Sequence, residues 1–235
     1  FADFWLGDQF CSLTFSLASL WTLACSVHND WAPDSYEKCG LAHHWQTPFV
    51  LSCMPSLIRF VQCLKRYSDS GLRMHMINGG KYLSSVMYYV FYYLWRHNGA
   101  KIGDTAFILL CLSGSVMSLY TSAWDLLVDW SLLDPMAEYR FLRTELLYRD
   151  YIPRYYFAIV SNVLIRFIWF SYFLVPSGLN ITPRTFIAAF LEILRRAHWN
   201  IYRLENEQLG NMDQYRATRE IPLPYTFQDE GEDDN

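Results

Sequence analysis

Apolar residues gather into six long runs along the chain, and polar residues mark the connections between them. The runs lie near residues 4–27, 47–64, 76–95, 103–124, 155–175 and 184–203. Each run reaches or approaches the roughly 20 residues that a helix needs to cross the hydrocarbon core of a bilayer. Only helices and closed barrels satisfy the backbone in lipid, and these runs are too long and continuous for barrel strands. The pattern therefore predicts an all-α fold, a polytopic transmembrane bundle of about six helices.

Composition supports a membrane protein. The chain has 235 residues, of which 52% are hydrophobic and 18% charged, whereas soluble domains usually carry about 25% charge. The cysteines form no CxxC pair and lie mostly inside the apolar runs, so we interpret them as small core residues and expect no disulfide or metal site. They are Cys11, Cys25, Cys39, Cys53, Cys63 and Cys111.

Basic residues predict the orientation of the bundle. The connections 65–75 and 125–154 carry most of the Lys and Arg found between the runs, and the alternate connections carry fewer. The positive-inside rule places these two connections and the C-terminus in the cytoplasm. We expect residues 1–211 to form the membrane domain and residues 212–235 to be an acidic, disordered cytoplasmic tail, because that segment is polar and ends in QDEGEDDN.

Charged residues recur inside the apolar runs, and each run contributes at least one. Residues three, four or seven apart share one face of a helix. On this basis Asn162, Arg166 and Trp169 share a face, and Glu192 shares one with Arg196. Charge inside a membrane segment is costly and persists mostly where it faces a polar cavity. The full set of charged candidates is Asp8, Arg59, Lys81, Asp125, Asp129, Arg166, Glu192, Arg195, Arg196 and Arg203. This pattern predicts a polar pathway through the bundle.

The candidate side chains favour an oxyanion as the transported species. Arginine stays charged in any environment and offers a planar fork to tetrahedral oxyanions such as phosphate or sulfate. The carboxylates are expected to hold the arginines while the site is empty and to prevent the anion from binding too tightly to leave. Trp169 and Trp199 are interpreted as bulky gates or as packing residues.

Simpler interpretations stay open for several of these residues. Arg59 and Arg203 lie near helix ends, where long side chains can reach the membrane surface. Asp125 and Asp129 are compatible with capping or pairing with the following cytoplasmic helix. Glu192 with Arg195 or Arg196 is compatible with a purely structural ion pair.

Six motifs together resemble the EXS domain of eukaryotic phosphate exporters, the family of the xenotropic and polytropic retrovirus receptor and its yeast and plant relatives. They are FWLGDQFCSL (4–13), PSLIRFVQCLKRYSDS (55–70), INGGKY (77–82), WDLLVDWSLLD (124–134), LIRFIWF (164–170) and LEILRRAHWNIYRLENEQLGN (191–211). They span nearly the whole chain, and its short acidic tail resembles fungal members.

The resemblance implies a phosphate export channel or transporter whose helices line the pathway. It assigns pathway positions to Asp8, Arg59, Lys81, Asp125, Asp129, Arg166, Arg195 and Arg196, and a gate to Trp169 and Glu192. Arg203 is kept as a pathway candidate from the helical-face argument. The family's N-terminal SPX domain, which senses inositol pyrophosphates, is not part of this chain. We therefore interpret the chain as a fragment and expect that domain in the full-length protein.

The expected partners are inorganic phosphate and the lipid bilayer, with a homodimer left open and no nucleic acid. The expected location is the plasma membrane or the Golgi and other endomembranes. No cofactor is expected, and the chain is not expected to be an enzyme. Two alternatives stay open: a Golgi or endoplasmic-reticulum protein that retains or recycles resident proteins, and a membrane-embedded lipid phosphotransferase that binds Mg²⁺ through Asp125 and Asp129.

Overall fold

The computed structural model describes residues 2–39, 44–171 and 181–219, and every regular element in these ranges is helical. The predicted all-α bundle is therefore confirmed. The elements are α1 (Ala2–Ser12), α2 (Thr14–His28), α3 (Ser35–Lys38), α4 (Gln46–Ser70), α5 (Arg73–His97), α6 (Thr105–Trp124), η1 (Asp125–Asp129), η2 (Arg149–Tyr151), α7 (Ile152–Arg166), η3 (Ile168–Phe170) and α9 (Ile181–Arg219).

The six apolar runs correspond to six helical units, two of which are broken. The first run is the pair α1 and α2, which bends by 60°, and the fifth run is α7 followed by the 3₁₀ turn η3. Helix α4 and the segment Thr105–Asp129 are long and apolar enough to cross a membrane, and the α1–α2 pair is a third candidate if it is one bent span. The other described helices do not meet the same length and hydropathy requirement. Helix α7 has only 15 residues, α5 is rich in tyrosine, and α9 is rich in charge.

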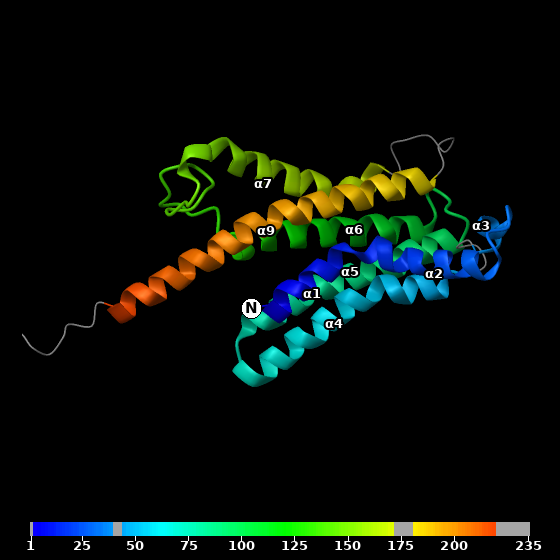
Figure 1. Ribbon diagram of the computed structural model, residues 1–235, viewed down its shortest axis with the longest axis horizontal. Helices are drawn as coiled ribbons and strands as arrows, with labels where there is room; N and C mark the ends of the chain where they lie inside the picture. The colour runs from blue at the N-terminus through cyan, green and yellow to red at the C-terminus, as the bar shows by residue number, and fades with distance from the viewer. Residues whose placement is uncertain (1, 40–43, 172–180, 220–235) are drawn as a thin grey trace, which may run out of the picture.

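The long helices lie alongside one another, and Figure 1 shows α4, α5 and α6 as neighbours, with α9 beside α7. We name the two ends of the bundle by their contents. The basic end holds the 71–72 and 130–151 connections, and the disulfide end holds α3. Helix α9 extends beyond the other helices at the basic end (Figure 1). It continues through the predicted domain boundary at residue 211 to Arg219, and residues 220–235 of the predicted tail lie outside the described residues.

Local signals explain where the central helices begin and end. Gly71 follows α4 with φ of 70°, and its N–H donates to the Tyr67 carbonyl at 2.8 Å. A left-handed residue at this position suits glycine because it has no Cβ. The Asp104 carboxylate accepts from the Thr105 N–H at 2.7 Å and caps the start of α6. These caps mark the end of α4 and the start of α6.

The buried face of α6 carries several small and hydroxyl side chains, and its exposed face is apolar, unlike the exposed face of a helix on a soluble protein. Ser118 is 0% exposed and Gly114 is also buried, whereas Leu119 is 62% and Leu112 60% exposed. Small and hydroxyl side chains let neighbouring helices approach closely, and large aliphatic side chains suit lipid. The exposure pattern of α6 therefore fits a bundle that faces hydrocarbon on its outer surface.

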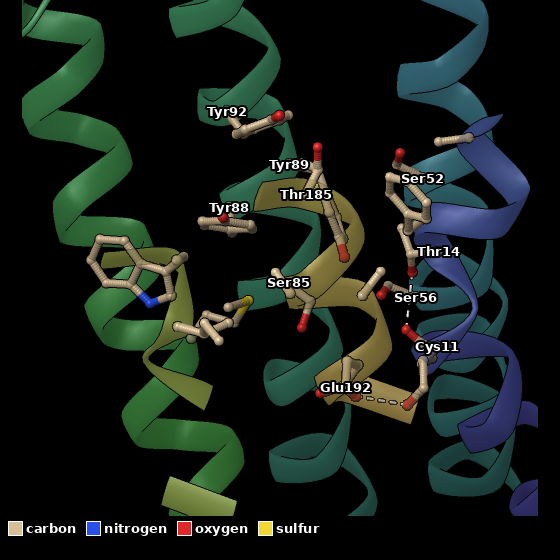
Figure 2. Close-up of a pocket in the computed structure, with 18 of the residues that line it drawn as sticks. Cys11, Thr14, Ser52, Ser56, Ser85, Tyr88, Tyr89, Tyr92, Thr185 and Glu192 are labelled. Atoms are coloured by element: carbon tan, nitrogen blue, oxygen red, sulfur yellow. Dashed lines mark hydrogen bonds between the residues drawn. The ribbon is translucent and has the colours of Figure 1, made fainter. Parts of the chain in front are cut away.

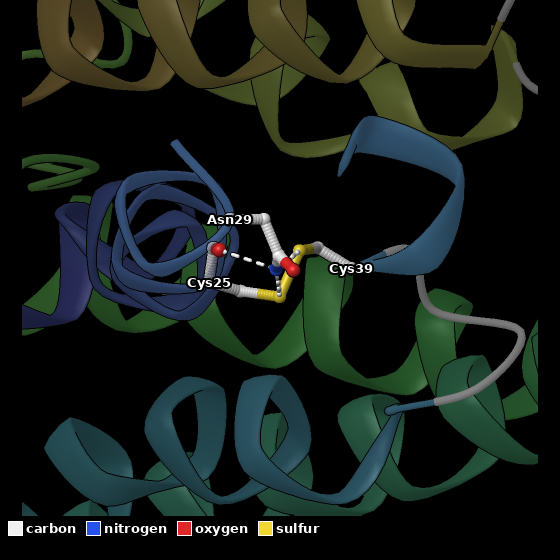
Figure 3. The surroundings of a disulfide bond; sticks show 3 residues. All are labelled: Cys25, Asn29 and Cys39. Carbon is white, nitrogen blue, oxygen red and sulfur yellow. Dashed lines mark hydrogen bonds between the residues drawn. A yellow bond between two sulfur atoms is a disulfide. The ribbon is translucent and has the colours of Figure 1, made fainter. Parts of the chain in front are cut away.

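The interpretation of all six cysteines as core residues is wrong for two of them. Cys25, in the last turn of α2, forms a disulfide with Cys39, just after α3. Their Cα atoms lie 5.8 Å apart, because the chain reverses after α2 and α3 returns Cys39 to the helix end (Figure 3). The Asn29 side-chain amide donates to the Cys25 carbonyl at 2.8 Å beside this bond. The two cysteines are 14 residues apart without a CxxC spacing, so the sequence alone gave no sign of the reversal.

At the basic end, the connection between η1 and α7 folds onto α7 and α9. Trp130, Leu142 and Tyr155 form an apolar cluster there with Trp199 and Tyr202 of α9. Next to this cluster, Glu205 is buried in an ion pair with Arg143 at 2.7 Å and also accepts from the Tyr155 hydroxyl at 2.5 Å. These contacts hold α9 against the 130–151 connection, on the basic-end side of the α9 segment that carries Arg195 and Arg196.

Candidate functional site

A cavity of about 1330 Å³ lies inside the bundle between α1, α2, α4, α5, α6, α7 and α9. Most of the predicted site residues line it: Asp8, Lys81, Asp125, Asp129, Arg166, Trp169, Glu192 and Arg196. Arg59 and Arg195 are not in its lining but are buried and paired with lining carboxylates. Helices that are far apart in the sequence thus bring the predicted charges into one space.

Asp125 is the most heavily engaged carboxylate of the cavity. Its Oδ2 accepts from Arg166 Nη2 at 2.7 Å and from Asn162 Nδ2 at 3.2 Å, and Arg195 Nη1 lies 3.4 Å away. Its Oδ1 accepts from the Trp199 indole at 3.1 Å. Asp125 opens a π-helical turn in which the Trp130 N–H donates back to the Asp125 carbonyl at 2.9 Å. Such turns often occur at functional sites.

Helix α9 carries a second group of charges next to Asp125. Arg195 forms a two-bond contact with Glu192, with Nε to Oε2 at 2.7 Å and Nη2 to Oε1 at 2.6 Å. Ser12 of α1 donates to Glu192 Oε1 at 2.7 Å and accepts from Arg196 Nε at 2.7 Å. The Arg196 guanidinium also lies over the Trp199 ring, 4.4 Å from its centroid. The α1–α2 bend follows Ser12 directly and so lies beside this group.

A third group joins α1, α4 and α5. Arg59 is 2% exposed and pairs with Asp8 at 3.0 Å. The Tyr82 hydroxyl accepts from Arg59 Nη2 at 2.9 Å and donates to Asp8 Oδ1. Gln62 accepts from Arg59 Nη1 at 2.7 Å. This arginine therefore points into the bundle and does not extend to the membrane surface, so the structure does not support the simpler interpretation of Arg59 as a surface-reaching side chain.

Two cations of the cavity differ from the three arginines above. Lys81 is 7% exposed and Arg196 9% exposed, yet within the described ranges neither has a carboxylate within 4.0 Å. The Lys81 ammonium instead lies over the rings of Tyr82 at 4.4 Å and Trp124 at 5.2 Å. Buried charge without a counter-ion is expensive. These two groups are therefore the cations of the cavity best placed to receive an anion.

Asp129 and Arg203 lie at the basic end of the cavity and are only loosely associated. Arg203 Nε is 3.9 Å from Asp129 Oδ1, and Arg203 Nη1 pairs with Glu207 at 3.1 Å. The other Asp129 oxygen is buried without a hydrogen-bond partner among the described residues. Asp129 lines the cavity, whereas Arg203 does not.

Toward the disulfide end, hydroxyls and aromatic rings make up most of the described lining, together with the cation Arg96 in the last turn of α5. Figure 2 shows Tyr88, Tyr89 and Tyr92 of α5 along this part of the cavity, with Ser52 and Ser56 of α4 opposite. Thr14 and Thr185 add hydroxyls from α2 and α9, and Glu192 lies at the charged side of this region (Figure 2). The cavity therefore has a charged half and a hydroxyl-lined half, with Trp169 contacting Tyr88 at 6.4 Å between ring centroids.

Several contacts were not predicted because neutral side chains give weak signals in an apolar run. Ser12, Tyr82 and Ser118 each bridge two site groups, but serine and tyrosine are common in membrane helices. Proximity to a predicted charge could have pointed to two of them, because Ser12 lies one turn after Asp8 and Tyr82 adjoins Lys81. Asn162 and Trp199 lay on the predicted faces, and both contact Asp125.

Comparison with known proteins gives matches over nearly the whole chain. The EXS family model matches residues 1–209. Protein SYG1 of Saccharomyces cerevisiae is 36% identical over 250 residues, which cover 99% of this chain and 27% of that protein. Solute carrier family 53 member 1 of Homo sapiens is 37% identical over 244 residues, covering 95% of this chain and 35% of that protein. Phosphate transporter PHO1 homolog 1 of Arabidopsis thaliana is 34% identical over 239 residues, covering 97% of this chain and 29% of that protein. The chain spans between about a quarter and about a third of the length of these relatives.

Proposed function

This chain belongs to the EXS family, and on that premise we propose that it forms the membrane core of an inorganic phosphate exporter. Phosphate passes through the cavity between the helices, without a covalent step. The likeness to a protein named as a phosphate transporter supports the choice of substrate. The observation that carries the proposal is the presence of two buried cavity cations, Lys81 and Arg196, that have no carboxylate partner among the described residues.

The roles of the cavity residues follow from their partners. Asp8, Asp125 and Glu192 hold Arg59, Arg166 and Arg195 in place by ion pairs of 2.6–3.4 Å. Phosphate that enters from the basic end reaches Lys81 and Arg196, whose charges it can neutralise without displacing a carboxylate. Arg166 lines the same space and can exchange its bond to Asp125 for one to phosphate. The carboxylates then recapture the arginine as phosphate leaves, so binding stays weak enough for conduction.

The direction of transport follows from charge and orientation. We propose that the basic end faces the cytoplasm and that the protein lies in the plasma membrane or an endomembrane. The disulfide at the opposite end supports this orientation, because disulfides persist on the oxidising side of a membrane. An inside-negative potential drives an anion outward through a pathway in that orientation.

The lipid-phosphotransferase alternative is disfavoured by the contacts of Asp125. Both of its oxygens accept from arginine, amide or indole groups, so Mg²⁺ would have to replace these donors. The retention-scaffold alternative gives no reason for a cavity lined by charges from most helices of the bundle. Neither alternative is favoured by a contact in the described part of the chain.

The test is efflux of radiolabelled phosphate from proteoliposomes that contain the full-length protein, with sulfate as competitor. Lys81→Met and Arg196→Met remove charge but keep an aliphatic stem. Hydrogen bonds to charged groups contribute about 1.5–3 kcal/mol, so we expect the phosphate concentration for half-maximal efflux to rise roughly 10- to 100-fold in either variant. Lys65→Met is the matched control, because Lys65 is an exposed cation on α4 outside the cavity.

Two results would contradict the proposal. Absence of phosphate efflux from a folded, full-length wild type would refute export itself. Half-saturation equal to that of the wild type in both cavity variants would refute the assigned binding role of Lys81 and Arg196.

A further inference from the structure

Trp169 is held against α6 by two residues that the sequence did not single out. Its indole N–H donates to Ser118 Oγ at 2.8 Å, and the same hydroxyl donates to the Arg166 carbonyl at 2.7 Å. One turn earlier on α6, Gly114 faces the ring: a Cβ there would lie 2.9 Å from Trp169 Cε2 and 3.0 Å from Cζ2. The indole thus packs against the bare backbone of Gly114 and hydrogen-bonds the Ser118 hydroxyl; we call this pair of contacts the Trp169 seat.

The seat is located where α7 breaks. Helix α7 ends at Arg166, and the Phe167 N–H is shared between the Val163 and Leu164 carbonyls at 3.3 and 3.2 Å. The chain then continues as the 3₁₀ turn η3, which carries Trp169. A break of this kind frees carbonyls that must find other donors in a dry interior. Ser118, which is 0% exposed, supplies one of these donors.

The same hydroxyl connects Trp169 to the charged half of the cavity. Arg166 accepts the Ser118 bond through its backbone and pairs with Asp125 through its guanidinium at 2.7 Å. A displacement of the indole therefore removes a donor from Ser118, and a displacement of the Arg166 backbone removes the acceptor of that hydroxyl. The two events share one buried group.

We propose that Ser118 and Gly114 are positioning residues that latch Trp169 at the junction between the charged and hydroxyl-lined halves of the cavity. The latch couples movement of the indole to the Asp125–Arg166 pair, so phosphate that draws the Arg166 side chain from Asp125, and the backbone at Arg166 with it, also loosens Trp169. This inference rests on the proposed phosphate passage. It assigns Ser118 to the movement of Trp169 that lets phosphate pass, not to phosphate binding.

The test is a double-mutant cycle in the full-length protein with Ser118→Ala and Trp169→Phe. Loss of one buried neutral hydrogen bond is worth roughly fivefold in an equilibrium. We expect Ser118→Ala to raise the maximal efflux rate about fivefold at unchanged half-saturation, and Ser118→Thr, which keeps the hydroxyl, to restore the wild-type rate. Trp169→Phe should raise the rate in the wild type but have no further effect in the Ser118→Ala background, because the bond is already absent.

Ser113→Ala is the matched control, since among the described residues the Ser113 hydroxyl bonds only within α6, to the Leu110 carbonyl at 3.1 Å. Independent effects that multiply in the double variant would overturn the latch, as would a changed half-saturation with an unchanged maximal rate. The same cycle measured on thermal unfolding in detergent requires no transport. If the wild type exports no phosphate, coupling in that cycle still supports the contact, and lack of coupling overturns it.

Discussion

Neutralising Asp125 is the perturbation for which the structure gives the sharpest expectation. Asp125→Asn keeps the size of the side chain but removes the charge that holds Arg166 at 2.7 Å and Arg195 at 3.4 Å. Arg195 keeps its two-bond pair with Glu192, so among the described residues Arg166 is the cation left without a carboxylate. Removing one partner of a buried ion pair typically costs about 3–5 kcal/mol, because the other charge is left uncompensated.

The same helix provides a matched control in Asp129→Asn. Asp129 lines the same cavity, but one of its oxygens has no hydrogen-bond partner in the described ranges, and its nearest cation is 3.9 Å away. Its neutralisation should therefore cost less than about 1 kcal/mol. With about 2–4 °C per kcal/mol for a chain of this size, the expected fall in unfolding temperature is about 6–20 °C for Asp125→Asn and within about 4 °C for Asp129→Asn.

The assay combines thermal unfolding in detergent with phosphate efflux from proteoliposomes. In Asp125→Asn, the freed guanidinium of Arg166 should hold phosphate more tightly, so half-saturation should fall roughly tenfold while the maximal rate also falls. Equal unfolding temperatures in the two variants would show that the Asp125 ion pairs do not stabilise the bundle. Weaker phosphate binding in Asp125→Asn would show that the carboxylate is not an internal competitor of the anion.

Three further changes test contacts outside this pair. Cys25→Ser should lower the unfolding free energy by about 3 kcal/mol, because the bond to Cys39 closes a loop with a separation of 14 residues, and should abolish the effect of reductant on thermal unfolding. Glu205→Gln should destabilise by about 3–5 kcal/mol by leaving buried Arg143 without its counter-ion, yet leave phosphate half-saturation unchanged in efflux assays. Tyr82→Phe should cost about 1–3 kcal/mol in unfolding, because its hydroxyl bridges both members of a buried ion pair.

The helical units and most of the charged cavity residues could be predicted from sequence, because both follow from the cost of polar groups in lipid. A run of about 20 apolar residues identifies a helix, and a charge within it must point inward. That rule placed Asp8, Lys81 and Arg196 in one cavity although they come from three separate helices. Their partners were not predictable, because pairing depends on the depth and rotation of each helix.

The breaks in the helices could not be predicted from the sequence either. The α1–α2 bend and the end of α7 interrupt runs that read as continuous, and no proline marks either break. Both breaks are compensated by hydroxyls: Thr14 donates to the Cys11 carbonyl at 2.9 Å, and Ser118 donates to the Arg166 carbonyl. A hydroxyl in an apolar run has the same appearance in the sequence whether it repairs a break or merely packs, so only the fold distinguishes the two.

The balance of charge explains why a pathway for an anion contains so many carboxylates. Around the charged half, the cations are Arg59, Lys81, Arg166, Arg195 and Arg196, and the carboxylates are Asp8, Asp125, Asp129 and Glu192. With all of these groups ionised, the described part of the chain holds one positive charge in excess there, since Arg203 has its own partner in Glu207. Five cations without carboxylates would be prohibitively costly in an empty cavity, and an exact balance would offer an anion nothing. Under the proposed function, a monovalent phosphate would neutralise this one uncompensated charge. The empty cavity would then attract the anion and release it when an arginine pair reforms.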